Sequence, residues 1–259
     1  MGKVAVITGA TSGIGLATAK RLIRKGYTVY GVARRARSDN DFVCFSADVC
    51  DFEAIDAILQ DIVAREGGID VFVNNAGIGI AGSSEEISAE NIQKITDVNL
   101  TATMVLCGKA ASLMKERGGY IVNVSSVGAI MPLPYQAAYS ATKAGIEVFS
   151  RALANELKPY HIKVTAVLPG DTKTGFTSAR ITEGKNQAAR KSVAKMERDE
   201  SKGKSPESVA KVIYKVIKRK RPPLRISVGL ISKIEVFLSR FLSVKCLNRI
   251  LYSMYGGKK

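Results

Sequence analysis

Short apolar runs alternate along the chain with longer segments in which apolar residues recur every three or four positions. The first pattern is typical of strands that are covered on both faces, and the second is typical of amphipathic helices. Strands are predicted at residues 3–8, 27–32, 42–47, 69–73, 119–124, 162–168 and 225–228. Helices are predicted at residues 13–25, 51–65, 89–115, 138–158 and 205–219.

This alternation predicts a single doubly wound α/β domain. Right-handed crossovers would place helices on both faces of a seven-stranded, mostly parallel sheet. A chain of 259 residues, 46% of them hydrophobic, can bury a sizeable core. Because no repeat and no Pro-rich or Gly/Ser-rich linker interrupts the pattern, we expect one domain over residues 1–229. Residues 230–259 would form a basic amphipathic helical extension of that domain.

A glycine-rich turn, Thr8 to Gly15, follows the first strand and precedes the first helix. Glycines let a backbone approach phosphates closely, and a helix N-terminus offers free N–H groups at its positive dipole end. A glycine-rich turn alone is weak evidence because loops use glycine routinely. Its place between a strand and a helix makes it a candidate pyrophosphate site of a Rossmann fold.

Tyr139 and Lys143 lie four residues apart in a predicted helix, so their side chains share one face. A cation beside a phenol favours the phenolate and lowers the phenol pKa. A tyrosine tuned in this way can pass a proton to or from a carbonyl oxygen. Taken alone, the pair could equally be a solvated pair on an ordinary helix. Ser126, thirteen residues before Tyr139, adds a hydroxyl to the candidate site.

Together these motifs resemble those of the short-chain dehydrogenase/reductase family in its single-domain form, including hydroxysteroid dehydrogenases and lipid carbonyl reductases. Thr8 to Gly15 match the family's T-G-x-x-x-G-x-G, and residues 74–77 match its N-N-A-G. Pro169 and Gly170 match the loop after the sixth strand. The catalytic tetrad of the family matches Asn99, Ser126, Tyr139 and Lys143. The resemblance runs from residue 3 to about residue 176 and implies an NAD(P)-dependent enzyme that acts on CH–OH groups.

The resemblance also implies a role for each tetrad residue. Tyr139 would be the general acid in reduction and the general base in oxidation, and Lys143 would lower its pKa and bond the nicotinamide ribose. Ser126 would donate to the substrate oxygen. Asn99 would hold a water that links Lys143 to solvent, or its amide would tie two strands together; both roles can coexist. Ser125 is the rival of Ser126, but the spacing to Tyr139 favours Ser126.

The end of the second strand predicts which nicotinamide cofactor is used. An acidic residue there would bind the ribose 2′-hydroxyl and select NAD. The residue at that position is Ala33, and Arg34 and Arg35 follow it, with Arg37 beyond. Since a guanidinium can clamp a 2′-phosphate, we expect NADP(H) to be favoured over NAD(H), with Arg34 as the main clamp. The alternative is that these arginines are ordinary surface charges.

Further positions match the family's cofactor contacts in the turns that follow the strands. Besides Arg34 and Arg35, the expected contacts are Gly9, Thr11, Ser12, Gly13, Ile14, Gly15, Asp48, Val49, Asn75, Ala76, Gly77, Tyr139, Lys143, Pro169, Gly170, Thr172 and Thr174. Asp48 could instead cap a helix or close a turn, and Asn74 could only stitch the sheet. Thr172 stands where the family has an aliphatic residue. Thr174 could bond a phosphate or be an ordinary turn residue.

Other chemistries find little support in the sequence. His161 is the only histidine and is expected to be structural. The cysteines have no metal-ligand spacing, so no metal site is expected. Their lack of pattern fits a reducing compartment. We expect no signal peptide, since the first strand begins at residue 3, and therefore a cytoplasmic protein.

Most of the net charge of +16 comes from the last part of the chain, where residues 202–259 hold fifteen Lys or Arg residues and two acidic ones. Apolar residues recur there at near-helical spacing from Leu230 to Met254, between Lys233, Arg240, Lys245 and Arg249. We expect first that this tail packs its apolar face on the domain. The second interpretation is peripheral association with an anionic membrane. Nucleic-acid binding is not expected, because no reading motif or stacking aromatics accompany the charge.

The substrate should lie between Tyr139, the segment after Pro134 and a lid at about residues 175–204. Met131, Tyr135 and Phe176 would contribute to an apolar wall, which favours a hydrophobic ketone, aldehyde or alcohol of steroid, retinoid or lipid type. The same residues could equally belong to the core. The lid is charged and has few large apolar residues; we expect it to be mobile when empty, and its charge could also suit an acidic substrate.

Two alternatives of other kinds remain open at this point. A 3-oxoacyl thioester reductase of the same fold would suit the basic surface, and a binding protein could retain the fold without catalysis. The intact tetrad argues against the second alternative. The helices predicted at 89–115 and 138–158 resemble the family's dimer-forming pair, so a homodimer or homotetramer is expected.

Overall fold

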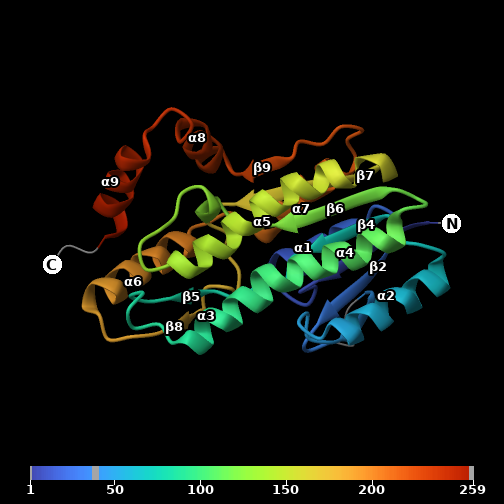
Figure 1. Ribbon diagram of the computed structural model, residues 1–259, viewed down its shortest axis with the longest axis horizontal. Helices are drawn as coiled ribbons and strands as arrows, with labels where there is room; N and C mark the ends of the chain where they lie inside the picture. The colour runs from blue at the N-terminus through green and yellow to red at the C-terminus, as the bar shows by residue number, and fades with distance from the viewer. Residues whose placement is uncertain (1, 37–40, 257–259) are drawn as a thin grey trace.

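The computed structural model describes residues 2–36 and 41–256, so Arg37 lies outside the described residues. One sheet has the strand order β3-β2-β1-β4-β6-β7-β9, and every neighbouring pair in it is parallel (Figure 1). Its strands are β1 (Lys3–Thr8), β2 (Tyr27–Ala33), β3 (Val43–Ser46), β4 (Val71–Asn74), β6 (Gly119–Val124), β7 (Ile162–Pro169) and β9 (Arg225–Val228). The predicted doubly wound, seven-stranded fold is confirmed.

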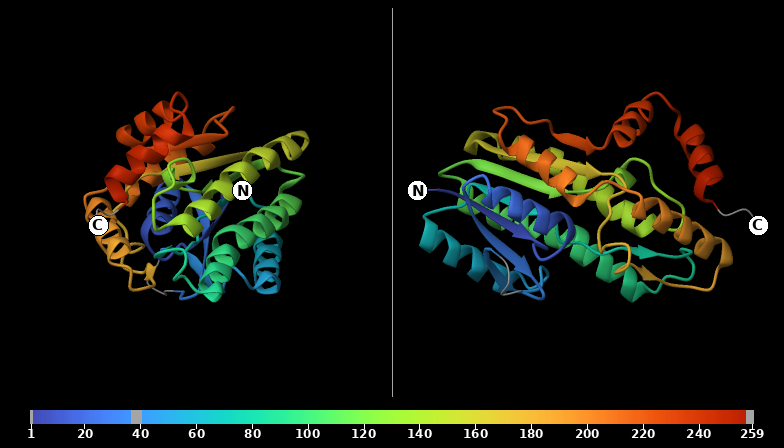
Figure 2. Two further views of the ribbon diagram at one scale, coloured as in Figure 1. Left: turned by 60° about the vertical axis from the view of Figure 1, so that its left-hand side comes forward. Right: turned by 180° about the vertical axis from the view of Figure 1, so that it is seen from behind.

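Helices cover both faces of this sheet, as Figure 2 shows from two sides. On one face lie α2 (Phe52–Glu66), α4 (Ala102–Met114) and α5 (Ala137–Glu156), whose buried side chains share a core with Phe72 and Ile121. On the other face, α1 (Gly13–Ile23) and α7 (Pro206–Ile217) pack on Ile7 and Val122. Because both faces are covered, the strands are almost continuously apolar, as the sequence pattern indicated.

The strand order reverses between β1 and β4, since β1 leads outward to β2 and β3 while β4 leads to β6. In open α/β sheets, ligands bind in the crevice beyond the carboxyl ends of the strands at such a switch point. The glycine-rich turn follows β1 there, and Asn75 follows β4. The fold therefore places these two motifs side by side.

The single helix predicted at 89–115 is instead broken into α3 (Ala89–Thr96), a π-helical turn (Asp97–Thr101) and α4. Asn99 lies at the centre of the π turn and is completely buried. Single π turns inside α-helices frequently mark functional positions. Here the extra residue in the turn directs the Asn99 side chain away from the helix and toward the loop after β4.

The lid contains more regular structure than the sequence predicts. Within it, β8 (Ile181–Thr182) pairs in parallel with β5 (Ile80–Ala81), and α6 (Gln187–Ser201) follows. The apolar pattern does not predict α6, because the buried face of this helix consists only of Ala189, Ser192, Val193 and Met196. Short 3-10 turns at Val127–Ala129 and Lys158–Tyr160 flank α5.

The C-terminal extension forms two helices, α8 (Leu230–Leu238) and α9 (Val244–Tyr255). They lie at the end of the molecule toward which the strand arrows point, above α6 in Figure 1. The expectation that this tail packs its apolar face on the domain is wrong for most of its length, because only Val236 and Leu251 among its large apolar side chains are buried. Within the described residues, no helix is long and apolar enough to cross a membrane.

Candidate active site

The glycine-rich turn is held tightly against the end of β4. Asn75 donates its side-chain amide to the carbonyl oxygens of Thr8 (3.0 Å) and Gly9 (3.3 Å). Thr8 in turn accepts from the backbone N–H groups of Asn75 and Ala76, both at 3.0 Å. A Cβ atom on Gly15 would lie 2.2 Å from the Gly9 carbonyl oxygen, so only glycine fits there. Gly9 itself has φ of 66°, a conformation that favours glycine.

The N-terminus of α1 is open for an anion. Ser12 precedes the helix in an extended conformation, and its side chain makes no capping hydrogen bond. The first N–H groups of a helix have no partner within it, so they can bind phosphate oxygens. Thr174, from the loop after β7, lies at this end, since a Cβ atom on Gly13 would be 3.3 Å from its Cβ. The fold thus brings Thr11, Ser12, Gly13, Ile14 and Thr174 to one place, and this set fits the pyrophosphate of a dinucleotide.

The end of β2 presents the two arginines to solvent. Ala33 is buried, whereas Arg34 and Arg35 are exposed. The Asp48 side chain accepts from the Cys50 N–H at 2.9 Å, which makes Asp48 a turn residue, and Val49 is packed in the core. The arginine side chains are therefore free of the core and stand where a ribose 2′-substituent would be read in this fold.

The catalytic side chains lie together at the carboxyl end of β6 and at the first turns of α5. Ser126 follows β6 and lies next to Tyr139 of α5, since a Cβ atom on Gly128 would be 3.4 Å from Ser126 Oγ and 3.8 Å from a carbon of the Tyr139 ring. The Ser126 hydroxyl accepts from the Gly128 N–H at 3.1 Å. Ser125 is buried and donates to the Lys143 carbonyl oxygen at 2.8 Å, so its hydroxyl supports α5 and does not face the tyrosine. The structure therefore brings Ser126, and not Ser125, to Tyr139.

Lys143 is buried one helical turn beyond Tyr139. Its Nζ lies 5.8 Å from the centre of the Tyr139 ring and donates to the Val124 carbonyl oxygen at 3.0 Å. Burial lowers the pKa of Lys143 to about 8, because a buried ammonium has lost its hydration.

Contrary to the expectation from the sequence, the pKa of Tyr139 is not below its ordinary value in this structure. The pKa of Tyr139 is raised, chiefly by burial of the phenol and also by the negative charge of Glu200. The neighbouring Ser126 hydroxyl and the positive charge of Arg180 oppose this rise in the pKa without overcoming it. The ammonium of Lys143 is directed to Val124 and does not touch the phenol oxygen.

Asn99 links the π turn to both the cofactor loop and the catalytic helix. Its side chain accepts from the Ile78 N–H (2.8 Å) and donates to the Ile78 carbonyl (3.0 Å) and the Thr142 hydroxyl (3.3 Å). A Cβ atom on Gly77 would lie 3.1 Å from Asn99 Oδ1 and 3.5 Å from Lys143 Nζ. The amide thus serves the connecting role considered from the sequence, although it joins a loop and a helix where two strands were expected.

The lid brings one of the expected substrate residues to the catalytic tyrosine. It also brings two charged residues that the sequence analysis did not identify. The Phe176 and Tyr139 rings lie 5.8 Å apart and are tilted by 54°. Arg180 and Glu200 form an ion pair near these rings. The charge of Glu200 raises the pKa of Tyr139, and the charge of Arg180 lowers it. Glu200 also accepts from the Thr177 hydroxyl. Nothing in the local pattern distinguishes these two charges from their solvated neighbours in the lid, so only the fold reveals them.

The other two expected substrate residues lie in the loop between β6 and α5. Met131 is half-buried there. Tyr135 adopts φ of 64° and donates its hydroxyl to the Gly256 carbonyl oxygen at 3.1 Å, at the end of α9. On the opposite side, the Thr172 hydroxyl donates to the Gly170 carbonyl at 2.8 Å, and Gly170 packs under Ser232 of α8. The tail therefore contacts the loops on both sides of the substrate region.

The sequence analysis also did not predict a chain of buried side-chain hydrogen bonds that links the sheet to α5. Asn74 donates to the Asn123 side-chain oxygen at 2.9 Å, and Asn123 donates to the Ser150 hydroxyl at 2.9 Å. Cys107 contacts both asparagines. These bonds tie β4 and β6 to α5 directly behind the catalytic residues. The stitching role considered for Asn74 is thus the one the structure shows.

The comparisons with known proteins agree with this geometry. A family model described as short chain dehydrogenase matches residues 3–185. A 3-ketodihydrosphingosine reductase from Bacteroides thetaiotaomicron is 37% identical over 236 residues, which cover 88% of each chain. A 3beta-hydroxysteroid dehydrogenase 1 from Eggerthella lenta is 34% identical over 202 residues, 73% of this chain and 77% of that one. The crystal structure of a short-chain dehydrogenase from Streptomyces avermitilis superposes with a TM-score of 0.84 at 33% identity, covering 95% of this chain and 94% of that one.

Proposed function

Because the chain belongs to the short-chain dehydrogenase family, we propose that it is an NADP(H)-dependent reductase that converts the ketone of a long-chain lipid into a secondary alcohol. The family itself places the protein among oxidoreductases that act on CH–OH groups. The observation that carries the proposal is that Ser126 lies next to Tyr139, with the Lys143 ammonium near the tyrosine ring and Phe176 beside it.

The residues of the site have separate tasks in this reaction. NADP(H), held at the glycine-rich turn and the N-terminus of α1, would supply the hydride for the carbonyl carbon. Tyr139 gives its phenolic proton to the carbonyl oxygen as the C–H bond forms, so the product is an alcohol and a tyrosinate remains. Ser126 holds the same oxygen by a hydrogen bond and stabilises the charge that develops on it. The positive charge of Lys143 stabilises the tyrosinate until a solvent proton restores the phenol.

The substrate class rests on the walls of the site and on the relatives. Phe176 packs on the catalytic ring, and Met131 lies half-buried in the loop between β6 and α5, so both can offer apolar surface to a substrate. The relative with 37% identity is named as a 3-ketodihydrosphingosine reductase, whose substrate is a ketone on a long alkyl chain. A 3-keto sphingoid base is therefore the first substrate to test.

We expect purified protein to oxidise NADPH with 3-ketodihydrosphingosine at a kcat/KM at least about tenfold above that for a 3-ketosteroid or for acetoacetyl thioester, since one or two lost pocket contacts cost this much. The measurement is the fall in NADPH absorbance with each ketone in turn. Preference for the steroid or the thioester would overturn the lipid-ketone assignment, while the protein would still be a reductase. Cofactor binding without turnover of any of the three would favour a binding protein.

Arg34 is expected to determine the choice between NADPH and NADH. Loss of a charge-assisted bond to a 2′-phosphate costs about 1.5–3 kcal/mol, so Arg34→Ala should raise the KM for NADPH by roughly tenfold to a hundredfold. The KM for NADH should stay within about twofold, because that cofactor has no 2′-phosphate. Arg24→Ala, at the opposite end of α1, removes an exposed arginine and serves as the control. Equal effects on the two cofactors would show that Arg34 is a surface charge.

A further inference from the structure

The C-terminal extension presents an apolar surface to solvent. Its large side chains are more exposed than those of an ordinary surface helix, with Leu230 and Ile231 each 73% exposed, Phe241 72% and Val244 76%. We define the tail surface as these four residues together with Ile234, Phe237, Leu238, Ile250, Tyr252 and Met254, all of them exposed. Ten exposed large apolar side chains on two consecutive helices are more than the singly scattered apolar residues of an ordinary surface, and such a concentration marks an interaction site.

Positive charge accompanies this surface. Lys233, Arg240, Lys245 and Arg249 are all exposed on or between the two helices, whereas the extension has one acidic residue, Glu235, and its side chain is partly covered. Helices with an apolar face, cationic flanks and little negative charge lie in the interface of anionic membranes. A second copy of this chain is a poorer partner, because a twofold interface would bring the same cations face to face.

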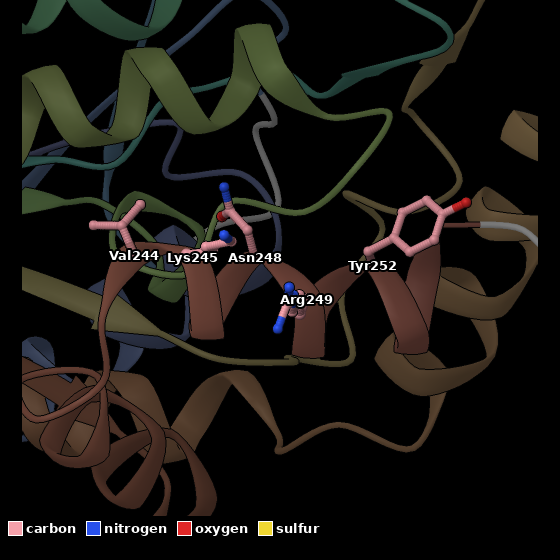
Figure 3. Close-up of a pocket in the computed structure, with 5 residues that line it drawn as sticks. All are labelled: Val244, Lys245, Asn248, Arg249 and Tyr252. Atoms are coloured by element: carbon pink, nitrogen blue, oxygen red, sulfur yellow. The ribbon is translucent and has the colours of Figure 1, made fainter.

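A hollow on α9 combines both features. It has a volume of about 630 Å³ and is lined by Val244, Lys245, Asn248, Arg249 and Tyr252, which lie along one side of the helix (Figure 3). Two cationic side chains and an amide suit the phosphate of a lipid headgroup. Val244 and Tyr252 add apolar surface beside them, which suits the upper part of an acyl chain.

The tail is fixed to the domain on the two sides of the substrate region. At one side, Ser232 of α8 packs on Gly170. At the other side, Lys195 of α6 donates to the Met254 carbonyl at 2.7 Å, and Tyr255 donates to Asp199 at 2.9 Å. If another surface bound the exposed side of α8 and α9, these contacts would also fix the lid helix and the Tyr135 loop relative to that surface.

We propose that the tail surface docks the protein on an anionic phospholipid membrane, so that a lipid ketone reaches Tyr139 from the bilayer. The delivery of substrate rests on the proposed function, whereas the docking itself does not. The apolar side chains enter the headgroup region, and the four cations pair with lipid phosphates.

Vesicle sedimentation with the full chain tests the docking without any catalysis. The protein should sediment with vesicles of phosphatidylglycerol and phosphatidylcholine and stay in solution with phosphatidylcholine alone. Since each cation near an anionic surface adds about 1 kcal/mol, Lys245→Gln with Arg249→Gln should lower the partition coefficient roughly thirtyfold. Lys220→Gln with Arg221→Gln is the matched control, because these exposed cations precede β9, at the end of that strand opposite to the one from which α8 continues.

Activity on a short, water-soluble ketone without vesicles separates the two proposals. If the charge variant keeps this activity and loses vesicle binding, docking is supported independently of substrate. If wild type ignores anionic vesicles, docking is wrong even when the reductase is active. If Phe241→Ser converts a larger oligomer into a smaller one in sedimentation velocity and vesicles have no effect, the tail surface is a subunit interface and the membrane proposal is overturned.

Discussion

Replacement of Tyr139 by Phe is expected to lower kcat/KM for ketone reduction by about 10²- to 10⁴-fold, the usual contribution of a positioned general acid. The variant keeps the ring that packs against Phe176 and loses only the phenolic hydroxyl. Affinity for NADPH should change little, because the proposed site for the cofactor phosphates is the glycine-rich turn. Initial rates and a fluorescence titration with NADPH measure the two effects separately.

Tyr160→Phe is the matched control for this substitution. Tyr160 is an exposed tyrosine beyond the C-terminal end of α5, and its ring lies under the Lys115 ammonium, so it also loses only a hydroxyl. We expect its kcat/KM to stay within about twofold of wild type, as for most surface substitutions. A Tyr139→Phe enzyme that kept a third of its activity would show that another group protonates the substrate.

The sequence predicts the sheet and the catalytic pair well because both depend on local signals. Each buried strand carries its own apolar run, and the four-residue spacing of Tyr139 and Lys143 fixes their shared face whatever surrounds the helix. The glycine-rich turn is equally local, since Gly15 is required by its contact with Gly9, only six residues earlier.

Features that depend on distant contacts could not be predicted in this way. The π turn at Asn99 depends on hydrogen bonds to Ile78 and Thr142, which lie in other elements. The ion pair of Arg180 with Glu200 becomes part of the site only because α6 folds back beside Tyr139. The raised pKa of Tyr139 also follows from burial, which a helix pattern does not reveal.

The exposed tail shows a second limit of prediction from the sequence: the pattern predicts helices but not what they contact. Its near-helical apolar pattern predicts that one face of each helix is buried. The pattern does not say whether the surface that buries this face belongs to the same domain or to another molecule or a membrane. Only the structure shows that the domain covers little more than Val236 and Leu251. The C-terminal tail is thus the part of the protein for which the sequence pattern is least decisive.

Replacement of Lys143 by Met is expected to remove activity and to stabilise the fold near neutral pH. Loss of the charge that supports the tyrosinate should lower kcat/KM by at least about 10²-fold. The buried ammonium also destabilises the folded state, because its pKa falls from 10.5 to about 8 on folding. A shift of this size corresponds to about 3 kcal/mol, and the lost bond to Val124 offsets about 1 kcal/mol of the gain. The free energy of unfolding should therefore rise by about 2 kcal/mol near pH 7.

The pH dependence of that gain identifies its cause. Below a pH of about 8, Lys143 is charged in both states and the wild type bears the full cost of burial. As the pH rises from about 8 toward 10.5, the folded protein releases its proton while the unfolded chain keeps its own, so the wild type regains stability relative to the variant. Urea unfolding near pH 7 and near pH 9.5 should show the difference shrinking to about zero. Lys158→Met, at an exposed lysine, is the control and should shift stability equally at both pH values. A Lys143→Met protein less stable than wild type, with an unchanged difference at the two pH values, would mean that its surroundings fully compensate the buried ammonium.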